Sequence, residues 1–209
     1  MKDSEPVRVM IVDDHPVVRF GLASILSSQP DMVVAAQAAT GKEAVALSQR
    51  HKPDVVLMDL RLPGMSGVEA IVAIRKISPE TRFVVLTTYE GDEDIHRALE
   101  AGAHAYLVKG SSHTDLLKAI RAVHEGRRFI SPSASKSLAG RPPASELSAR
   151  EREILEFIVK GKSNKEIADA LGITEGTVKW HVNLILSRLS VSDRTQAAVT
   201  ALHRGIVHL

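Results

Sequence analysis

The chain has 209 residues, of which 44% are apolar and 25% charged, and its 27 basic and 25 acidic side chains leave a net charge of +2. This composition is typical of globular protein, excludes a wholly disordered chain, and is too nearly neutral to indicate nucleic-acid binding by itself. Disulfides and thiolate metal sites are excluded because there is no cysteine. With no signal-peptide pattern and no apolar run of about 18 residues, we expect a cytoplasmic protein that does not enter a membrane.

Residues 1–125 alternate short apolar runs with longer amphipathic stretches, which predicts a βαβ series. We expect an α/β domain in which five strands and five helices form a doubly wound parallel sheet. Capping boxes at residues 40–43 and 66–69 mark two helix starts. The predicted strands are Val7–Val12, Met32–Ala38, Val55–Met58, Phe83–Thr87 and Ala105–Val108.

Residues 126–146 are rich in serine, proline and glycine and have little periodicity, so we expect a linker with a short helix around residues 133–138. Residues 147–209 contain no strand pattern and predict an all-α domain of four helices. Ser148 and Ser163 open the first two with capping boxes, Thr174 caps the third, and Ser192 caps the last, which runs to about Arg204. The glycine-containing turn between the second and third helices is typical of a helix-turn-helix.

Two predicted strands end in acidic residues, Asp13 and Asp14 after the first and Asp59 after the third. Ligands bind at the C-terminal edge of open parallel sheets, so we expect these carboxylates to converge there. Like charges this close require a cation, and an all-oxygen ligand set favours Mg²⁺. An aspartate beside Mg²⁺ can accept a phosphoryl group.

Thr87 ends the fourth predicted strand and Lys109 follows the fifth. Both should lie at the same edge of the sheet as the acids. A hydroxyl and an ammonium there can hydrogen-bond the oxygens of a phosphorylated Asp59.

The order and spacing of these motifs over nearly the whole chain identify a family resemblance. Residues 7–125 resemble the flavodoxin-like receiver domain of bacterial two-component response regulators, and residues 147–209 resemble the LuxR-type DNA-binding domain. The whole chain therefore resembles the NarL/FixJ class. The motifs are residues 12–15, Asp59 with residues 62–67, Thr87, residues 105–109, residues 147–151 and residues 176–179.

The resemblance assigns roles to the residues at the acidic edge. It implies that Asp59 is the phosphoacceptor and that Lys109 pairs with the phosphoryl group. It implies that Thr87 and Tyr106 are a switch pair, Thr87 moving toward the phosphate and Tyr106 rotating inward. The implied Mg²⁺ ligands are Asp14, Asp59 and the backbone carbonyl of Arg61, with Asp13 assisting.

The third helix of the C-terminal region predicts a DNA-reading face. Val178, Val182, Ile185 and Leu189 form its apolar stripe, which leaves Lys179, Trp180 and Asn183 on the far side. By resemblance, these three contact bases, whereas Lys165 and Thr177 contact phosphates. The alanine face of the last helix, Ala197, Ala198 and Ala201, is the candidate contact with a second copy.

We therefore expect a transcription regulator, whose only catalysis is its own phosphoryl transfer and dephosphorylation. Its expected partners are a sensor histidine kinase, double-stranded promoter DNA, a second copy on phosphorylation or on DNA, and RNA polymerase.

One alternative is a phosphohydrolase of the haloacid dehalogenase kind, but its DxDx[TV] pattern is absent because Asp13 and Asp14 are adjacent and Asp59 stands on another strand. Another is an adaptor whose helical region binds protein, which a gel shift would distinguish.

Overall fold

The computed structural model describes residues 5–88, 91–139 and 147–208. The chain divides into an N-terminal unit that runs to Ser135, without residues 90–94, and a C-terminal unit from Lys136 onward. None of the helices in the described residues is both long and apolar enough to cross a membrane.

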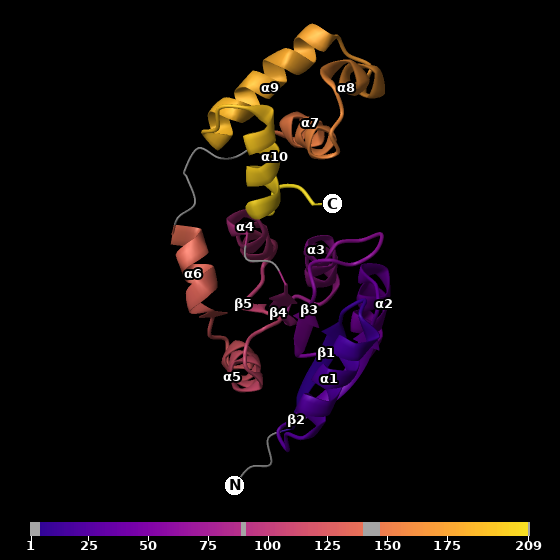
Figure 1. Cartoon of the computed structure of the whole chain (residues 1–209). Coiled ribbons are helices and arrows are strands. Elements are labelled where there is room, and N and C mark those ends of the chain that lie inside the picture. Colours follow the sequence, from indigo (N-terminus) through magenta and orange to yellow (C-terminus); the bar gives the residue numbers. More distant parts are fainter. Residues whose placement is uncertain (1–4, 89–90, 140–146, 209) are drawn as a thin grey trace. The chain divides into compact units, whose positions relative to one another are not determined.

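A six-stranded parallel sheet forms the centre of the N-terminal unit, in the order β2-β1-β3-β4-β5-β6 (Figure 1). The strand order reverses direction between β1 and β3, the switch point at which doubly wound sheets bind ligands. The strands are β1 (Val7–Val12), β2 (Met32–Ala38), β3 (Val55–Met58), β4 (Arg82–Thr87), β5 (Ala105–Val108) and β6 (Phe129–Ile130).

The five predicted strands are confirmed, and only β4 differs, beginning one residue earlier at Arg82. The sixth strand, β6, lies in the stretch that we expected to be a linker. Its two residues are too few to produce a periodic pattern. The same stretch contains α6 (Pro132–Ala139), which extends the short helix expected there.

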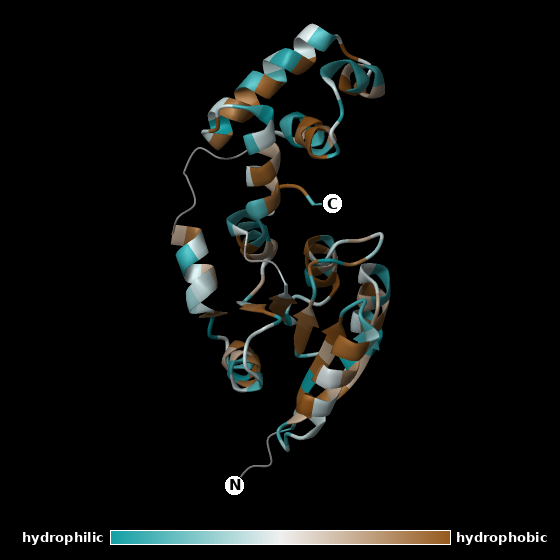
Figure 2. Cartoon of the chain, viewed as in Figure 1, coloured by the Kyte–Doolittle hydropathy of each residue, from teal (hydrophilic) through white to brown (hydrophobic). Residues whose placement is uncertain are grey.

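The inner strands β3, β4 and β5 are buried on both faces almost throughout, as expected for apolar strands of a parallel sheet, whereas the edge strand β2 is partly exposed. On one face Ile11 packs in a cluster with Leu26 and Ile120, which lie on two of the surrounding helices. Met58 and Phe83 point to the other face and are also fully buried. Figure 2 shows the strands as the apolar centre of the unit.

Five helices connect the strands of the N-terminal unit. The capping box at Ser66 and Glu69 is formed as predicted. At Thr40 only half of the predicted box is present, because the Glu43 carboxylate accepts from the amide of Ala39 instead of Thr40. The helices are α1 (Pro16–Ser27), α2 (Gly41–His51), α3 (Gly67–Ile77), α4 (Asp92–Ala101) and α5 (His113–His124).

Within residues 147–208, four helices surround a separate apolar core: α7 (Ala149–Val159), α8 (Asn164–Leu171), α9 (Glu175–Leu189) and α10 (Arg194–His203). Gly172 ends α8 with a φ of 63°, a left-handed conformation that glycine adopts without strain. The turn to α9 is therefore tight. The cap of α10 is Asp193, which corrects the expectation of Ser192, and Ser192 instead donates to the side chain of Gln196.

Candidate functional site

The C-terminal ends of β1 and β3 bring two buried carboxylates together. These strands are paired with Val12 opposite Met58, so the next residues, Asp13 and Asp59, also lie side by side. Asp13 and Asp59 are 2% and 3% exposed, whereas Asp14 faces outward. The expected convergence of the three acids is present, since their oxygens lie within 4.8 Å of one another.

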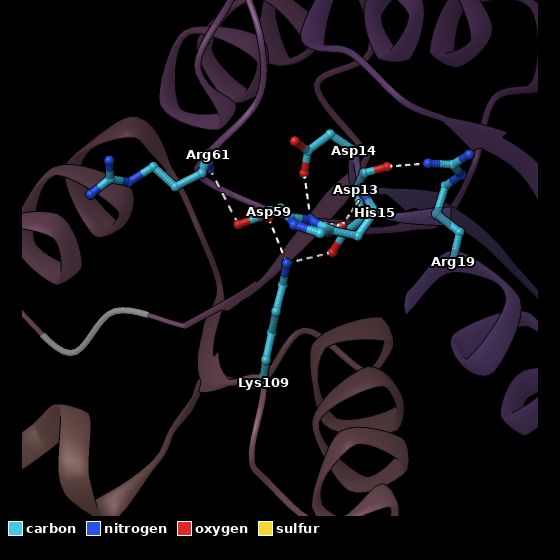
Figure 3. A network of polar contacts seen from close by, with 7 residues as sticks. All are labelled: Asp13, Asp14, His15, Arg19, Asp59, Arg61 and Lys109. Atoms are coloured by element: carbon cyan, nitrogen blue, oxygen red, sulfur yellow. Dashed lines mark hydrogen bonds and ion pairs between the residues drawn. The ribbon is translucent and has the colours of Figure 1, made fainter. Parts of the chain in front are cut away.

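Lys109 joins the two buried carboxylates. Its Nζ lies 2.7 Å from Asp13 Oδ2 and 2.6 Å from Asp59 Oδ2 (Figure 3). The backbone holds it there, because Lys109 follows β5 and its N–H donates to the carbonyl of Thr87 at 2.8 Å. The site thus places one ammonium between two carboxylates.

Burial and charge oppose each other in this cluster. Burial raises the pKa of Asp59, although the hydrogen bond from Lys109 lowers it. Burial also disfavours the charged form of Lys109, but Asp13 and Asp59 outweigh it and raise the Lys109 pKa. The ammonium is therefore firmly charged. The three carboxylates carry more negative charge than the one ammonium neutralises, and a divalent cation would neutralise the excess.

The donors at this edge fit Mg²⁺. Asp13, Asp14 and Asp59 offer carboxylate oxygens within reach of one point, and hard divalent cations prefer such ligands. The backbone of Arg61 is also close, because its N–H donates to Asp59 Oδ1 at 3.2 Å. Asp14 is partly exposed, which leaves the site open to solvent on one side.

Two residues that sequence reasoning missed also belong to the site. His15 Nδ1 lies 2.7 Å from Asp14 Oδ1 and 3.2 Å from Asp13 Oδ1, and the His15 amide donates to Asp13 Oδ1 at 2.9 Å. Arg19 Nη1 donates to the Asp13 carbonyl at 2.7 Å (Figure 3). His15 stands next to Asp14 in the sequence, but only the turn into α1 aims its ring back at the acids.

The two predicted switch residues are both fully buried. Thr87 ends β4, and its Oγ1 has no hydrogen-bond partner among the described residues. A buried hydroxyl without a partner costs free energy unless a ligand satisfies it. Tyr106 lies on the neighbouring strand β5, with no exposed surface, so its ring occupies the inward position here.

The α9 helix of the C-terminal unit has the two faces that were predicted. Val178, Ile185 and Leu189 are buried in its core, with Val182 half-buried. On the other side Lys179 and Asn183 are exposed, and Trp180 is 59% exposed. Trp180 is therefore a large apolar side chain exposed on an otherwise polar helix face.

The two expected phosphate contacts are exposed as well. Lys165 lies in the first turn of α8, and Thr177 lies in the first turn of α9. The Thr177 hydroxyl lies 2.8 Å from that of the capping residue Thr174. Lys179 forms an ion pair with Glu175 one turn earlier, at 3.1 Å.

The expected contact face on α10 is corrected by the structure. Ala197 and Ala201 have no exposed surface and belong to the core of the C-terminal unit, so they are not available to a second copy. Ala198 is half-buried, and the exposed apolar residue of α10 is Val199, at 51% exposure. Small residues let α10 approach its neighbours closely within the unit.

Known proteins resemble this chain over nearly its full length. The family model of the response regulator receiver domain matches residues 9–121, and that of the luxR family of bacterial regulatory proteins matches residues 145–201. The response regulator protein VraR of Staphylococcus epidermidis and that of Staphylococcus aureus are each 41% identical over 206 residues, which cover 96% of this chain and 99% of theirs.

A solved structure gives the same result. The response regulator ChrA of a heme-sensing two-component system is 39% identical, with 98% of this chain and 100% of that chain covered and a TM-score of 0.59. These likenesses favour neither a phosphohydrolase nor an adaptor. The chain belongs to the NarL/FixJ class of two-component response regulators, which join a receiver domain to a LuxR-type DNA-binding domain.

Proposed function

We propose that Asp59 accepts a phosphoryl group from a sensor histidine kinase and that this modification controls the binding of promoter DNA by α9. The observation that carries the proposal is the position of Asp59, buried at the end of β3 with Lys109 Nζ 2.6 Å from its Oδ2. A buried carboxylate held against an ammonium at the switch point of the sheet is a nucleophile with its charge already compensated.

The transfer requires no covalent chemistry beyond the carboxylate itself. An Asp59 oxygen attacks the phosphorus of the kinase's phosphohistidine, a P–O bond forms, and the P–N bond breaks with its electron pair returning to the imidazole. Lys109 stabilises the negative charge on the phosphoryl oxygens. Hydrolysis of the resulting acyl phosphate by water returns Asp59 to its carboxylate form.

Magnesium fits this site through Asp13, Asp14 and Asp59, with the Arg61 carbonyl as a further ligand. When bound, it supplies positive charge to the oxygens of the transferring phosphoryl group. Lys109 lies between Asp13 and Asp59 and neutralises the charge of one carboxylate. Its ammonium therefore reduces the repulsion between the carboxylates and holds them together.

Phosphorylation reaches the rest of the receiver through Thr87 and Tyr106 in this proposal. The unpartnered Thr87 hydroxyl is available to donate to a phosphoryl oxygen on Asp59. Moving it toward the phosphate would leave more room beside β5, where the Tyr106 ring is already buried. This account predicts that the inward Tyr106 position is stabilised by phosphorylation.

DNA binding is assigned to the exposed face of α9. Lys179, Trp180 and Asn183 point away from the core and suit base edges in the major groove, while Lys165 and Thr177 suit phosphates. A helix-turn-helix gains affinity when a second copy reads a second half-site. We therefore assign dimerisation, on phosphorylation or on DNA, to the active form.

The test is phosphorylation of the full chain by acetyl phosphate with Mg²⁺, followed by gel shift on promoter fragments. Asp59→Asn should abolish acid-labile incorporation and the gain in DNA affinity that phosphorylation produces. Asp169→Asn, which removes an exposed carboxylate on α8, is the matched control and should label fully. Full labelling of the Asp59→Asn protein would show that another residue accepts the phosphoryl group.

A further inference from the structure

The edge of the sheet opposite Asp59, where the strands begin, gathers positive charge. Arg82 is the first residue of β4, His104 immediately precedes β5, and Arg128 immediately precedes β6. These three strands are neighbours. Backbone hydrogen bonds tie their starts together, from His104 N–H to the Phe83 carbonyl at 2.8 Å and from Phe129 N–H to the His104 carbonyl at 3.0 Å.

A third guanidinium group, that of Arg75 at the end of α3, is fixed beside this cluster. Its Nη1 donates to the Ala101 carbonyl at 2.9 Å. Its guanidinium lies over Gly102, whose φ is +106°, and a Cβ at Gly102 would stand 2.3 Å from Arg75 Nη1. The loop before His104 therefore has a glycine where the arginine passes. The Ala101 carbonyl therefore holds the Arg75 guanidinium in place.

The two ring nitrogens of His104 both face N–H donors, although a neutral imidazole has only one acceptor nitrogen. The Phe83 amide is fully buried and faces His104 Nδ1 at 3.3 Å. A buried amide requires an acceptor, so Nδ1 is unprotonated and Nε2 carries the ring proton. Nε2 then faces Arg82 Nη1 at 3.4 Å, and both of these atoms are donors.

The three arginines around His104 also lack anionic partners. Among the residues that the structure describes, no carboxylate lies within ion-pair distance of Arg75, Arg82 or Arg128. Neighbouring arginines differ, since Arg127 pairs with Glu125 and Arg121 pairs with an aspartate. Burial lowers the pKa of His104, and the charges of Arg82, Arg75 and Arg128 lower it further. The ring is therefore a neutral donor beside three guanidinium groups that form no ion pair with the described residues.

We propose that Arg75, Arg82, His104 and Arg128 form a binding site for a small phosphorylated ligand. One phosphate oxygen between His104 Nε2 and Arg82 Nη1 accepts from both donors and supplies the missing acceptor. Guanidinium groups match phosphate oxygens in geometry and charge better than other side chains do. Because Arg82, His104 and Arg128 place hydrogen-bond donors at the starts of three neighbouring strands, the site suits a ligand with two linked phosphates, such as pyrophosphate or a nucleoside diphosphate.

This site is independent of Asp59, so its ligand would bind the receiver whether or not phosphoryl transfer occurs. The experiment is NMR of the imidazole signals of the full chain during titration with pyrophosphate, at an ionic strength held constant with sodium chloride. We expect a saturable shift of the His104 signals, with the other histidines unaffected. Arg82→Gln should weaken the apparent affinity about tenfold or more, because it removes the paired donor.

Arg127→Gln is the matched control, since it removes an exposed arginine next to Arg128 that already has a carboxylate partner. It should leave the affinity unchanged. If Arg82→Gln does not fold, Arg128→Gln, at an exposed position, serves in its place. Equal losses for the Arg127 variant, or the same shift with sulfate, would reduce the site to an adventitious ion only and overturn the proposal. A His104 response to duplex DNA but not to pyrophosphate would overturn it also.

Discussion

Gly67 stands so close to the phosphoacceptor loop that a Cβ on it would lie 2.1 Å from the Asp59 carbonyl oxygen. The Gly67 N–H donates to the Leu60 carbonyl at 3.0 Å. The first residue of α3 therefore packs directly on the backbone that carries Asp59. The start of the helix and the position of the carboxylate are set by the same contact, and no side chain larger than hydrogen can make it.

Gly67→Ala should consequently destabilise the receiver. The added methyl meets rigid backbone, so we expect the free energy of unfolding to fall by about 2 kcal/mol, within the range typical of overpacking. Displacement of Asp59 should also slow labelling by acetyl phosphate. Urea unfolding and labelling rates measure the two effects.

Gly21 provides the control for this substitution. It lies inside α1, where a Cβ would meet nothing within 4 Å. Gly21→Ala should raise the free energy of unfolding by roughly 0.5–1 kcal/mol, because alanine restricts the unfolded chain. If the two alanine variants changed stability alike, the contact between Gly67 and Asp59 would be irrelevant to the fold.

A pH-dependent contribution is expected from Asp31 and Arg121. Arg121 Nε and Nη2 donate to the Asp31 carboxylate at 2.7 and 3.0 Å, and these hydrogen bonds lower the Asp31 pKa. A lowered folded-state pKa means that the contribution is present above the unfolded value of about 3.9 and is lost as the pH falls through the folded value. Both side chains are partly exposed, so the contribution is on the order of 0.5–1 kcal/mol.

Asp31→Asn should therefore lower the free energy of unfolding at pH 7 and have a smaller effect near pH 2. Denaturant unfolding of both proteins at the two pH values gives the comparison. Glu125→Gln, which breaks a more exposed pair with Arg127, should cost less at pH 7. A deficit of the Asp31 variant that stayed constant with pH would contradict the ion-pair explanation.

The acidic edge could be predicted from the sequence because its signal is local. Asp13 and Asp59 each follow an apolar run. Because neighbouring parallel strands end at the same edge of the sheet, the two carboxylates lie side by side. Lys109 follows the same rule on β5. His15 and Arg19 could not be found this way, since their contacts depend on how one turn enters α1.

Two features, β6 and the role of the alanine face of α10, could not be predicted from the sequence, for different physical reasons. The two residues of β6 have no period to detect. The alanine face of α10 was predicted to be a surface, but small residues allow close packing in a core as well as between subunits, and Ala197 and Ala201 are used in the core. Composition of a helix face does not say which neighbour covers it.

Alanine substitutions should distinguish the predicted base contact, Lys179, from the predicted phosphate contact, Lys165. Lys179 faces outward from the middle of the exposed face, so Lys179→Ala should cost about 1–3 kcal/mol on the specific site and change the sequence preference. Lys165→Ala should weaken binding to every sequence similarly and make affinity less dependent on salt. Gel shifts on specific and random duplexes at several salt concentrations measure both.

Lys160, exposed at the C-terminal end of α7, is the control for this comparison. Lys160→Ala removes the same charge from a residue outside α8 and α9, and we expect it to affect both duplexes little. Equal losses on specific and random DNA for the alanine variants of Lys179, Trp180 and Asn183 would show that this face does not read bases.

If a second copy contacts α10, we predict that it does so through Val199 and not through the buried alanines. Val199 is 51% exposed, while Ala197 and Ala201 on the same helix are packed in the core, so Val199 is the apolar side chain of α10 that is accessible to a second copy. Val199→Lys should therefore weaken the dimer formed with beryllofluoride or on DNA while leaving the stability of the monomer unchanged, because the lysine head stays in water when no partner is present. Sedimentation velocity with and without beryllofluoride, and with duplex DNA, measures the dimer.

Val72→Lys, at an exposed apolar position on α3 with 40% exposure, is the matched control and should dimerise normally. Ala201→Leu has the opposite signature: it should destabilise the C-terminal unit by overpacking, since Ala201 has no exposed surface. Normal dimers of the Val199→Lys protein would move the contact away from α10.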